Sequence, residues 1–119
     1  MTESKLNIDQ PTLSHFATNS AKNNNNVKTI LIQTDCLDNI IPKELPTHFI
    51  RIDVEGAEFQ VIEGATNTIR MNKTEIVFEP SPFSQRYFGI SSEMIYDLIT
   101  NQCGLRISLL QHRLKKKIL

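Results

Sequence analysis

The chain has 119 residues, with 13 basic and 13 acidic side chains and a formal net charge of zero. This length allows one domain, and the balanced charge gives no long-range field that would attract nucleic acid or an anionic membrane. The apolar stretches are much shorter than the roughly 20 residues of a membrane-spanning helix, and the N-terminus lacks the apolar core of a signal peptide. We therefore expect a cytoplasmic protein that binds neither nucleic acid nor membranes and that works through a local site.

Residues 1–26 are polar and end in the run Asn23–Asn26. Such a composition buries too little apolar surface to offset the entropy of ordering, so we expect a disordered N-terminal segment over 1–26. The folded part is expected to begin at Val27, where VKTILIQT has the β-branched composition of a strand. The next segment, DCLDNIIP, predicts a turn and a short helical piece that ends before Pro42.

A strand, a helix and a second strand are predicted next. Residues 49–54 (FIRIDV) lack clean alternation, which is typical of a strand buried on both faces of a parallel sheet. Arg51 interrupts this run, and it either lies near the start of the strand or pairs with an acid. Apolar residues at helical spacing predict a helix over about 57–71, in which Gly64 would allow close contact with the sheet. Residues 75–79 (EIVFE) predict the second strand.

These three elements have the size of one βαβ crossover, so the two strands are expected to be parallel. A second helix is predicted from an N-cap at Ser91 or Ser92 to a stop at Gly104, and residues 105–110 (LRISLL) alternate like a further strand. The alternation of strands and helices predicts an α/β protein with a mostly parallel sheet and flanking helices.

Carboxylates follow both predicted parallel strands. Asp53 and Glu55 end the first strand and Glu79 ends the second. Because the carboxyl ends of neighbouring parallel strands meet at one edge about 4.8 Å apart, these side chains can reach one cleft and serve acid/base work or bind a hydroxyl-rich or cationic ligand. The alternative is that they cap a helix or complement its dipole, and this applies most to Glu58 in the first helical turn.

Other residues give weaker indications. Cys36 and Cys103 form no C-x-x-C motif, so free thiols are favoured over a disulfide or a metal pair, and the three histidines share no metal-ligand spacing. No metal site is predicted. The aromatic residues Phe83, Tyr87 and Phe88 either wall a substrate pocket or pack over the sheet edge. Residues 115–119 are expected to form a basic tail.

The segment IRIDVEGAEFQVIEGATNTI, followed closely by IVFE, resembles the signature of the FkbM-type methyltransferase family. Members of this family are similar to the Rossmann-like, class I enzymes that use S-adenosylmethionine. Leu37 and Asp38 after a short strand also fit the family pattern, with Cys36 where a threonine is usual. The resemblance covers roughly residues 27–110.

The resemblance implies roles for the acidic residues. Asp53, Glu55, Gly56 and Glu58 correspond to the family's fourth-strand motif, and Glu79 closes the fifth strand beside the substrate. Members are similar to enzymes that methylate hydroxyl groups, often on sugars or small natural products.

One part of the family pattern is missing. Family members have a glycine-rich loop after the first strand, which lets the backbone approach the cofactor, whereas the first glycine of this chain is Gly56. We therefore expect a partial Rossmann-like methyltransferase fold over 27–114, in which the N-terminal cofactor half is missing and which binds S-adenosylmethionine poorly by itself.

Two functions from different classes follow. The first is an S-adenosylmethionine-dependent methyltransferase, present as a truncated or split domain, in which Asp53 orients or deprotonates the substrate hydroxyl while Glu79 and Glu55 position substrate or cofactor. The alternative is a catalytically inactive remnant that binds a companion chain or a second copy of itself through an exposed sheet edge. A hydrolase that uses the carboxylates directly is a weaker third hypothesis, since the sequence supplies neither its nucleophile nor its metal.

Overall fold

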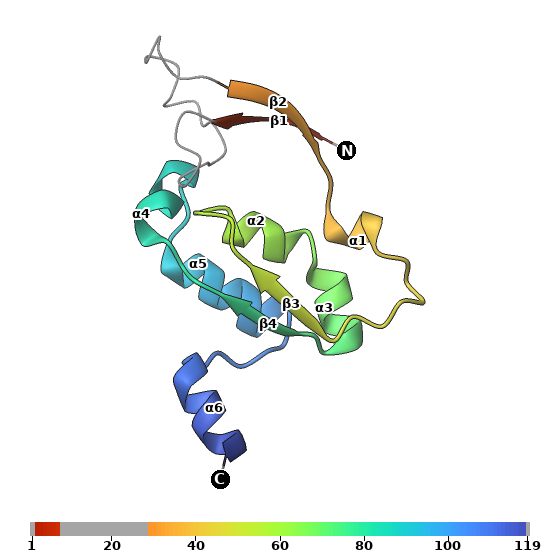
Figure 1. Cartoon of the computed structure of the whole chain (residues 1–119), viewed down its shortest axis with the longest axis vertical. Helices are drawn as coiled ribbons and strands as arrows, with labels where there is room; N and C mark the ends of the chain where they lie inside the picture. Colours follow the sequence, from red (N-terminus) through yellow and green to blue (C-terminus); the bar gives the residue numbers. More distant parts are fainter. Residues whose placement is uncertain (1, 8–28, 119) are drawn as a thin grey trace.

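The computed structural model describes residues 2–7 and 29–118 (Figure 1). The elements in chain order are β1 (Thr2–Asn7), β2 (Thr29–Thr34), α1 (Leu37–Ile40), β3 (Phe49–Ile52), α2 (Glu58–Glu63), α3 (Thr66–Asn72), β4 (Glu75–Phe78), α4 (Pro82–Gln85), the 3-10 helix η3 (Arg86–Phe88), α5 (Ser92–Asp97), the π-helix η4 (Leu98–Gln102) and α6 (Leu110–Ile118). None of the helices in these two ranges has the length and apolar character needed to cross a bilayer.

The centre of the fold is a short parallel sheet. β3 and β4 pair in parallel, with Phe49 opposite Glu75 and Ile52 opposite Phe78. α2 and α3 connect the two strands, as in a βαβ unit. The predicted parallel pairing is therefore confirmed, and the described part is a mixed α/β fold with flanking helices.

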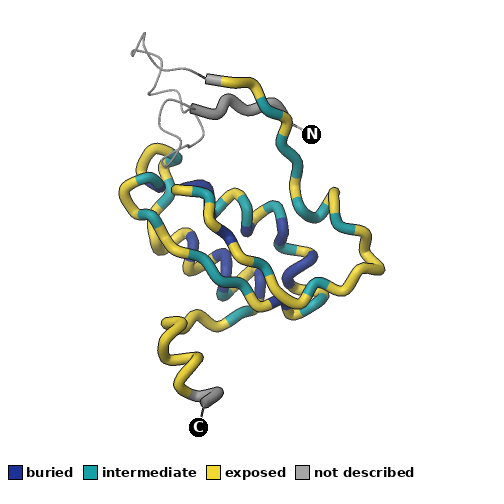
Figure 2. Tube along the Cα trace, viewed as in Figure 1, coloured by how far each residue is buried: buried dark blue, intermediate teal, exposed yellow. Residues whose placement is uncertain are grey.

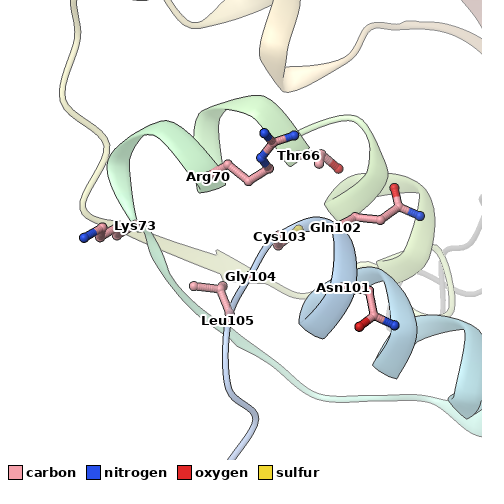
Figure 3. A pocket seen from close by; sticks show the side chains of 8 residues that line it. All are labelled: Thr66, Arg70, Lys73, Asn101, Gln102, Cys103, Gly104 and Leu105. Carbon is pink, nitrogen blue, oxygen red and sulfur yellow. The ribbon is translucent and has the colours of Figure 1, made fainter.

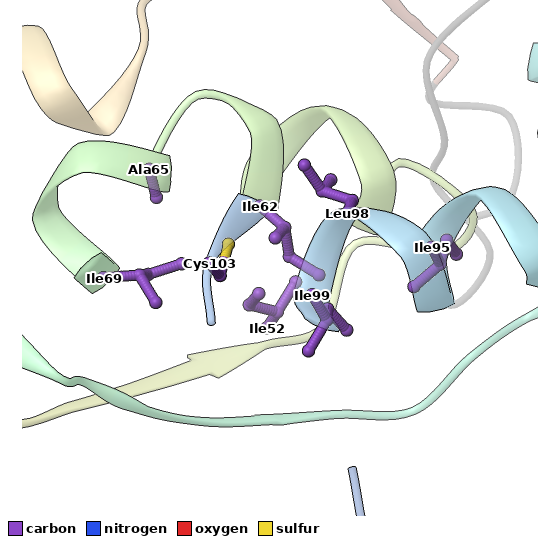
Figure 4. Packing of buried hydrophobic residues seen from close by; sticks show 8 residues of the cluster. All are labelled: Ile52, Ile62, Ala65, Ile69, Ile95, Leu98, Ile99 and Cys103. Atoms are coloured by element: carbon purple, nitrogen blue, oxygen red, sulfur yellow. The ribbon is translucent and has the colours of Figure 1, made fainter. Parts of the chain in front are cut away.

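The core lies between this sheet and a layer formed by α2, α3, α5 and η4 (Figure 4). It consists of Ile52, Ile62, Ala65, Ile69, Ile95, Leu98, Ile99 and Cys103. Each fully buried aliphatic side chain in such a cluster contributes roughly 1.5–3 kcal/mol relative to exposure. Packing by the apolar faces of these helices, rather than the two-stranded sheet alone, therefore stabilises the fold.

β3 is buried on one face, not on both as its composition suggested. Ile52 is 5% exposed and faces the helix layer, whereas Phe49 is 56% exposed and Arg51 is also exposed. In the described part of the chain the helices cover one side of the sheet, so the run of apolar residues was a misleading sign of two-sided burial. Figure 2 shows the buried residues gathered where the helix layer meets the sheet.

The predicted helix over 57–71 is two helices, α2 and α3, separated at Gly64 and Ala65. Asp38 explains the break, because its carboxylate accepts hydrogen bonds from the N–H groups of Asn67 and Thr68 and so begins a new helix there. A Cβ at Gly64 would lie 3.3 Å from atoms of Cys36. This glycine therefore allows close contact with the start of α1, whereas the sequence predicted close contact with the sheet.

The N-terminal region differs from its expectation. Residues 2–7 form β1, which pairs antiparallel with β2 from Thr2 opposite Thr34 to Asn7 opposite Thr29. The expectation of disorder is thus wrong for these six residues, because strand pairing satisfies backbone groups even where the side chains are polar. Residues 8–28 lie outside the described part, and the domain boundaries at 26 and 114 stay predictions.

The second predicted helix is confirmed. Ser91 is its N-cap and accepts a hydrogen bond from the N–H of Met94, and α5 continues as η4. Gly104 follows the end of the helix with a left-handed φ of 69°, the conformation that favours glycine as a helix stop.

The strand predicted over 105–110 is wrong. These residues have no regular structure until α6 begins at Leu110, and α6 contains the first residues of the expected basic tail. Leu105 packs against the core, but Ile107 and Leu109 are 47% and 60% exposed. Alternation makes a strand only where a neighbouring strand accepts its hydrogen bonds, and β3 and β4 are the only members of the parallel sheet in the described ranges.

Candidate functional site

The carboxyl edge of the parallel sheet brings two predicted residues together. Asp53 follows Ile52 directly, and Glu79 follows Phe78, the residue opposite Ile52 in β4. Both acidic residues are exposed. The prediction that they share one sheet edge is confirmed, and neighbouring strands about 4.8 Å apart allow both carboxylates to contact one ligand.

Asp53 has a cation beside it. Arg51 Nη2 donates a hydrogen bond to Asp53 Oδ2 at 3.0 Å, so Arg51 pairs with an acid. The two side chains are 72% and 58% exposed. An exposed pair of this kind contributes at most about 1 kcal/mol to stability, so a substrate group can replace either partner at small cost.

A tight turn carries the chain from β3 to α2. Glu55 has a left-handed φ of 49° and Gly56 a φ of 108°. Glu55 is exposed, whereas Gly56 is buried against α4: a Cβ there would lie 2.6 Å from Ser84 Cβ. Glycine is required at residue 56 because both the backbone angle and the approach of α4 exclude a side chain.

Glu58 faces the interior rather than the open edge. It is 1% exposed, its Oε1 accepts from the N–H of Gly56 at 2.9 Å, and its Oε2 accepts from Nε2 of Gln85 at 3.1 Å. Glu58 therefore ties the turn to α4, and contact with a ligand stays a prediction for this residue. Gln85, also 1% exposed, was missed because its pairing depends on α4 folding back onto the turn, which no local pattern encodes.

Two aromatic side chains lie just beyond the carboxyl end of β4. Phe83 of α4 and Tyr87 of η3 form an edge-to-face pair with ring centroids 5.7 Å apart. They are 70% and 50% exposed, so they are not packed away over the sheet. The segment that follows β4 and Glu79 thus presents exposed aromatic surface.

Asp38, the acid of the Leu37–Asp38 pair, has a structural contact in α3. Burial alone would raise the pKa of its carboxyl, but hydrogen bonds from the N–H groups of Thr68 and Asn67 outweigh this and lower that pKa below its ordinary value. Asp38 thus joins α1 to the helix layer and lies apart from the carboxyl edge.

Two surface grooves lie elsewhere in the described part. The first runs between α3 and the end of η4 (Figure 3) and is lined by Thr66, Arg70, Lys73, Asn101, Gln102, Cys103, Gly104 and Leu105. The second lies between α1 and α3. Neither groove contains a predicted site residue, and Asp53, Glu55 and Glu79 at the carboxyl edge are exposed. Among residues 2–7 and 29–118, no group of three or more potential ligand side chains could hold a metal ion.

Comparison with protein families assigns the chain to a family. The model of the methyltransferase FkbM domain matches residues 3–107, most of the 119-residue chain. The chain belongs to the FkbM methyltransferase family. No curated protein and no solved structure matches it. The family match begins well before residue 27, where the resemblance in the sequence was expected to start.

The FkbM family consists of S-adenosylmethionine-dependent methyltransferases, so the fit of that cofactor to this chain can be tested against the structure. The acidic edge suits hydroxyl or cationic groups. The backbone cradle that dinucleotide-type cofactors need follows a strand and opens a helix. Gly56 in the β3–α2 turn lies against Ser84, and Gly64 lies against Cys36. Gly89 and Gly104 have open space beside them, but they follow the helices η3 and η4 rather than a strand. The described glycines thus do not form such a cradle.

Proposed function

We propose that this chain supplies the substrate-binding half of a methyltransferase that acts on a hydroxyl group of a sugar or small natural product. Family membership supports the reaction class. The observation that carries the proposal is the placement of Asp53 and Glu79 at one exposed edge.

The two carboxylates have different tasks in this proposal. Asp53 accepts the hydroxyl proton at a carboxylate oxygen once the substrate displaces Arg51, and Glu79 holds the substrate by a hydrogen bond from a neighbouring hydroxyl. Glu55, exposed in the turn, helps to position either substrate or cofactor. Bound S-adenosylmethionine supplies the methyl group.

The exposed aromatic pair supports a ring-shaped substrate. Phe83 and Tyr87 offer apolar surface with a hydroxyl at one end, which suits the mixed apolar and polar faces of a sugar or aromatic natural product. Because they lie just after Glu79 in sequence, one ligand can contact the acid and the rings together.

The glycine cradle must come from elsewhere. No glycine precedes Gly56 in the 119 residues. In this proposal a companion polypeptide supplies the glycine-rich loop. Binding of S-adenosylmethionine to this chain alone is therefore expected to be weak, since most close backbone contacts are missing.

Titration calorimetry on the 119-residue protein tests this expectation. We expect no measurable heat of S-adenosylmethionine binding at micromolar concentrations. Submicromolar binding would show that other residues form a complete cofactor site.

The catalytic role is tested after a companion polypeptide with a glycine-rich loop restores binding. Asp53→Asn should then lower the rate of methyl transfer by about 10²–10⁴-fold while changing cofactor affinity little, because Asn retains the shape but accepts no proton. Glu63→Gln, on the exposed side of α2, is the matched control and should leave the rate unchanged. An unaffected rate in Asp53→Asn would exclude Asp53 as the base.

A binding function without catalysis is the second candidate. One face of the parallel sheet is open, and Phe49 on that face is 56% exposed. If no companion polypeptide restores cofactor binding, this candidate replaces the first.

A further inference from the structure

The outer edge of β3 carries backbone hydrogen-bonding groups that no residue of 2–7 or 29–118 pairs with. His48 O accepts from the N–H of Glu75, so the ladder with β4 uses the even-numbered residues of this strand. Phe49, Arg51 and Asp53 therefore direct their backbone groups to the opposite edge. Among the described residues, none of those groups has a backbone hydrogen bond outside the β3–β4 sheet.

The side chains along this edge are self-complementary. The sequence Ile50–Val54 (IRIDV) reads apolar, cationic, apolar, anionic, apolar, with Ile52 at its centre. If two copies pair antiparallel about Ile52, each Arg51 lies opposite Asp53 of the other copy, and each Ile50 lies opposite Val54.

The direction in which alternate residues point their backbone N–H and C=O groups agrees with this register. In an antiparallel pair, directly opposite residues either exchange two backbone hydrogen bonds or exchange none. Arg51 and Asp53 both direct backbone groups outward, so they form hydrogen-bonded pairs, while Ile52 faces Ile52 in a pair that exchanges none. A register shifted by two residues would place Arg51 opposite Arg51, which like-charge repulsion disfavours.

We propose that two copies of this chain associate through the outer edges of β3 and form a continuous four-stranded sheet. Two-stranded sheets are marginally stable, and pairing supplies acceptors for backbone donors that have no partner among the described residues. The alternating charges, Arg51 and Asp53 of each copy, form a ladder of four charges across the two-fold axis. This goes beyond the proposed methyl transfer and competes with it, because the paired Asp53 is held by an arginine of the second copy.

Sedimentation equilibrium from about 1 µM to about 1 mM protein tests the association. We expect a monomer–dimer equilibrium. Arg51→Asp should raise the dissociation constant roughly tenfold or more, since it places like charges opposite each other at two positions. Arg51→Asp with Asp53→Arg restores opposite charges in the same register and should return the dissociation constant to within a fewfold of the native value.

Arg113→Asp is the matched control. Arg113 also forms an exposed ion pair, with Glu75, but it lies on α6, away from the outer edge of β3. This variant should dimerise like the native chain. Far-ultraviolet circular dichroism checks that each variant is folded.

Amide hydrogen exchange identifies the paired edge. Protection of the Arg51 and Asp53 amides should rise with protein concentration, whereas the Ile50 and Ile52 amides, already directed to β4, should change little. A monomer at all concentrations, a dimer unaffected by Arg51→Asp, or a charge-swapped variant that stays monomeric would overturn the proposal.

Discussion

Truncation of Glu58 should destabilise the fold more than any change at the open edge. The Glu58→Ala variant removes the acceptor of two buried donors, the N–H of Gly56 at 2.9 Å and Nε2 of Gln85 at 3.1 Å. A buried donor left without an acceptor costs about 1–3 kcal/mol, so two such donors predict a loss of about 2–6 kcal/mol. Native domains have only about 5–15 kcal/mol of stability, so this loss removes much of the margin.

Two further variants separate hydrogen bonding from other effects. Glu58→Gln should cost much less, about 0–1.5 kcal/mol, because its amide oxygen can accept from Gly56 while its amide nitrogen donates to Gln85 after that side chain turns over. Glu63→Ala, at an exposed residue of the same helix, should change stability by less than about 0.5 kcal/mol.

Urea denaturation followed by far-ultraviolet circular dichroism measures these free energies of unfolding. The reasoning fails if Glu58→Ala costs no more than Glu63→Ala. It also fails if Glu58→Gln and Glu58→Ala are equally destabilising, since the hydrogen bonds would then not account for the loss.

Three other predictions concern the turn, the cap of α3 and the cysteines. Gly56→Ala should destabilise by about 2–5 kcal/mol in the same urea assay, through its positive φ and its clash with Ser84, and Ser84→Gly should recover part of that loss. Asp38→Ala should cost about 1–3 kcal/mol near neutral pH. Because the pKa of Asp38 is lowered in the fold, its contribution is fully present above the ordinary value of 3.8 and is lost as pH falls below it, so urea curves of the native chain and the variant should converge in acid. Iodoacetamide should alkylate exposed Cys36 much faster than buried Cys103, because burial raises the pKa of the Cys103 thiol. Mass spectrometry of a time course measures the two rates, and equal rates would contradict the prediction.

The sequence alone determined the features that depend on local chemistry. The spacing between FIRIDV and EIVFE leaves room for a helical crossover and little else, so the parallel pair and the shared edge of Asp53 and Glu79 could be predicted. Ser91 and Gly104 mark the ends of a helix through their own side chain or backbone freedom, and both predictions hold. The motif around Gly56 was enough to indicate the FkbM family.

The tertiary structure decided whatever depends on contacts between distant segments. Asp38 divides the predicted helix because it accepts hydrogen bonds from the N–H groups of Asn67 and Thr68, which are 29 and 30 positions later in the chain. Gln85 contacts Glu58 only because α4 returns to the turn. Residues 105–110 alternate like a strand, yet no neighbouring strand in the described part is available to pair with them. The mostly polar residues 2–7 form a strand because β2 supplies hydrogen bonds that composition does not reveal. In each case the presence or absence of a long-range partner outweighs a local preference of a few tenths of a kcal/mol per residue.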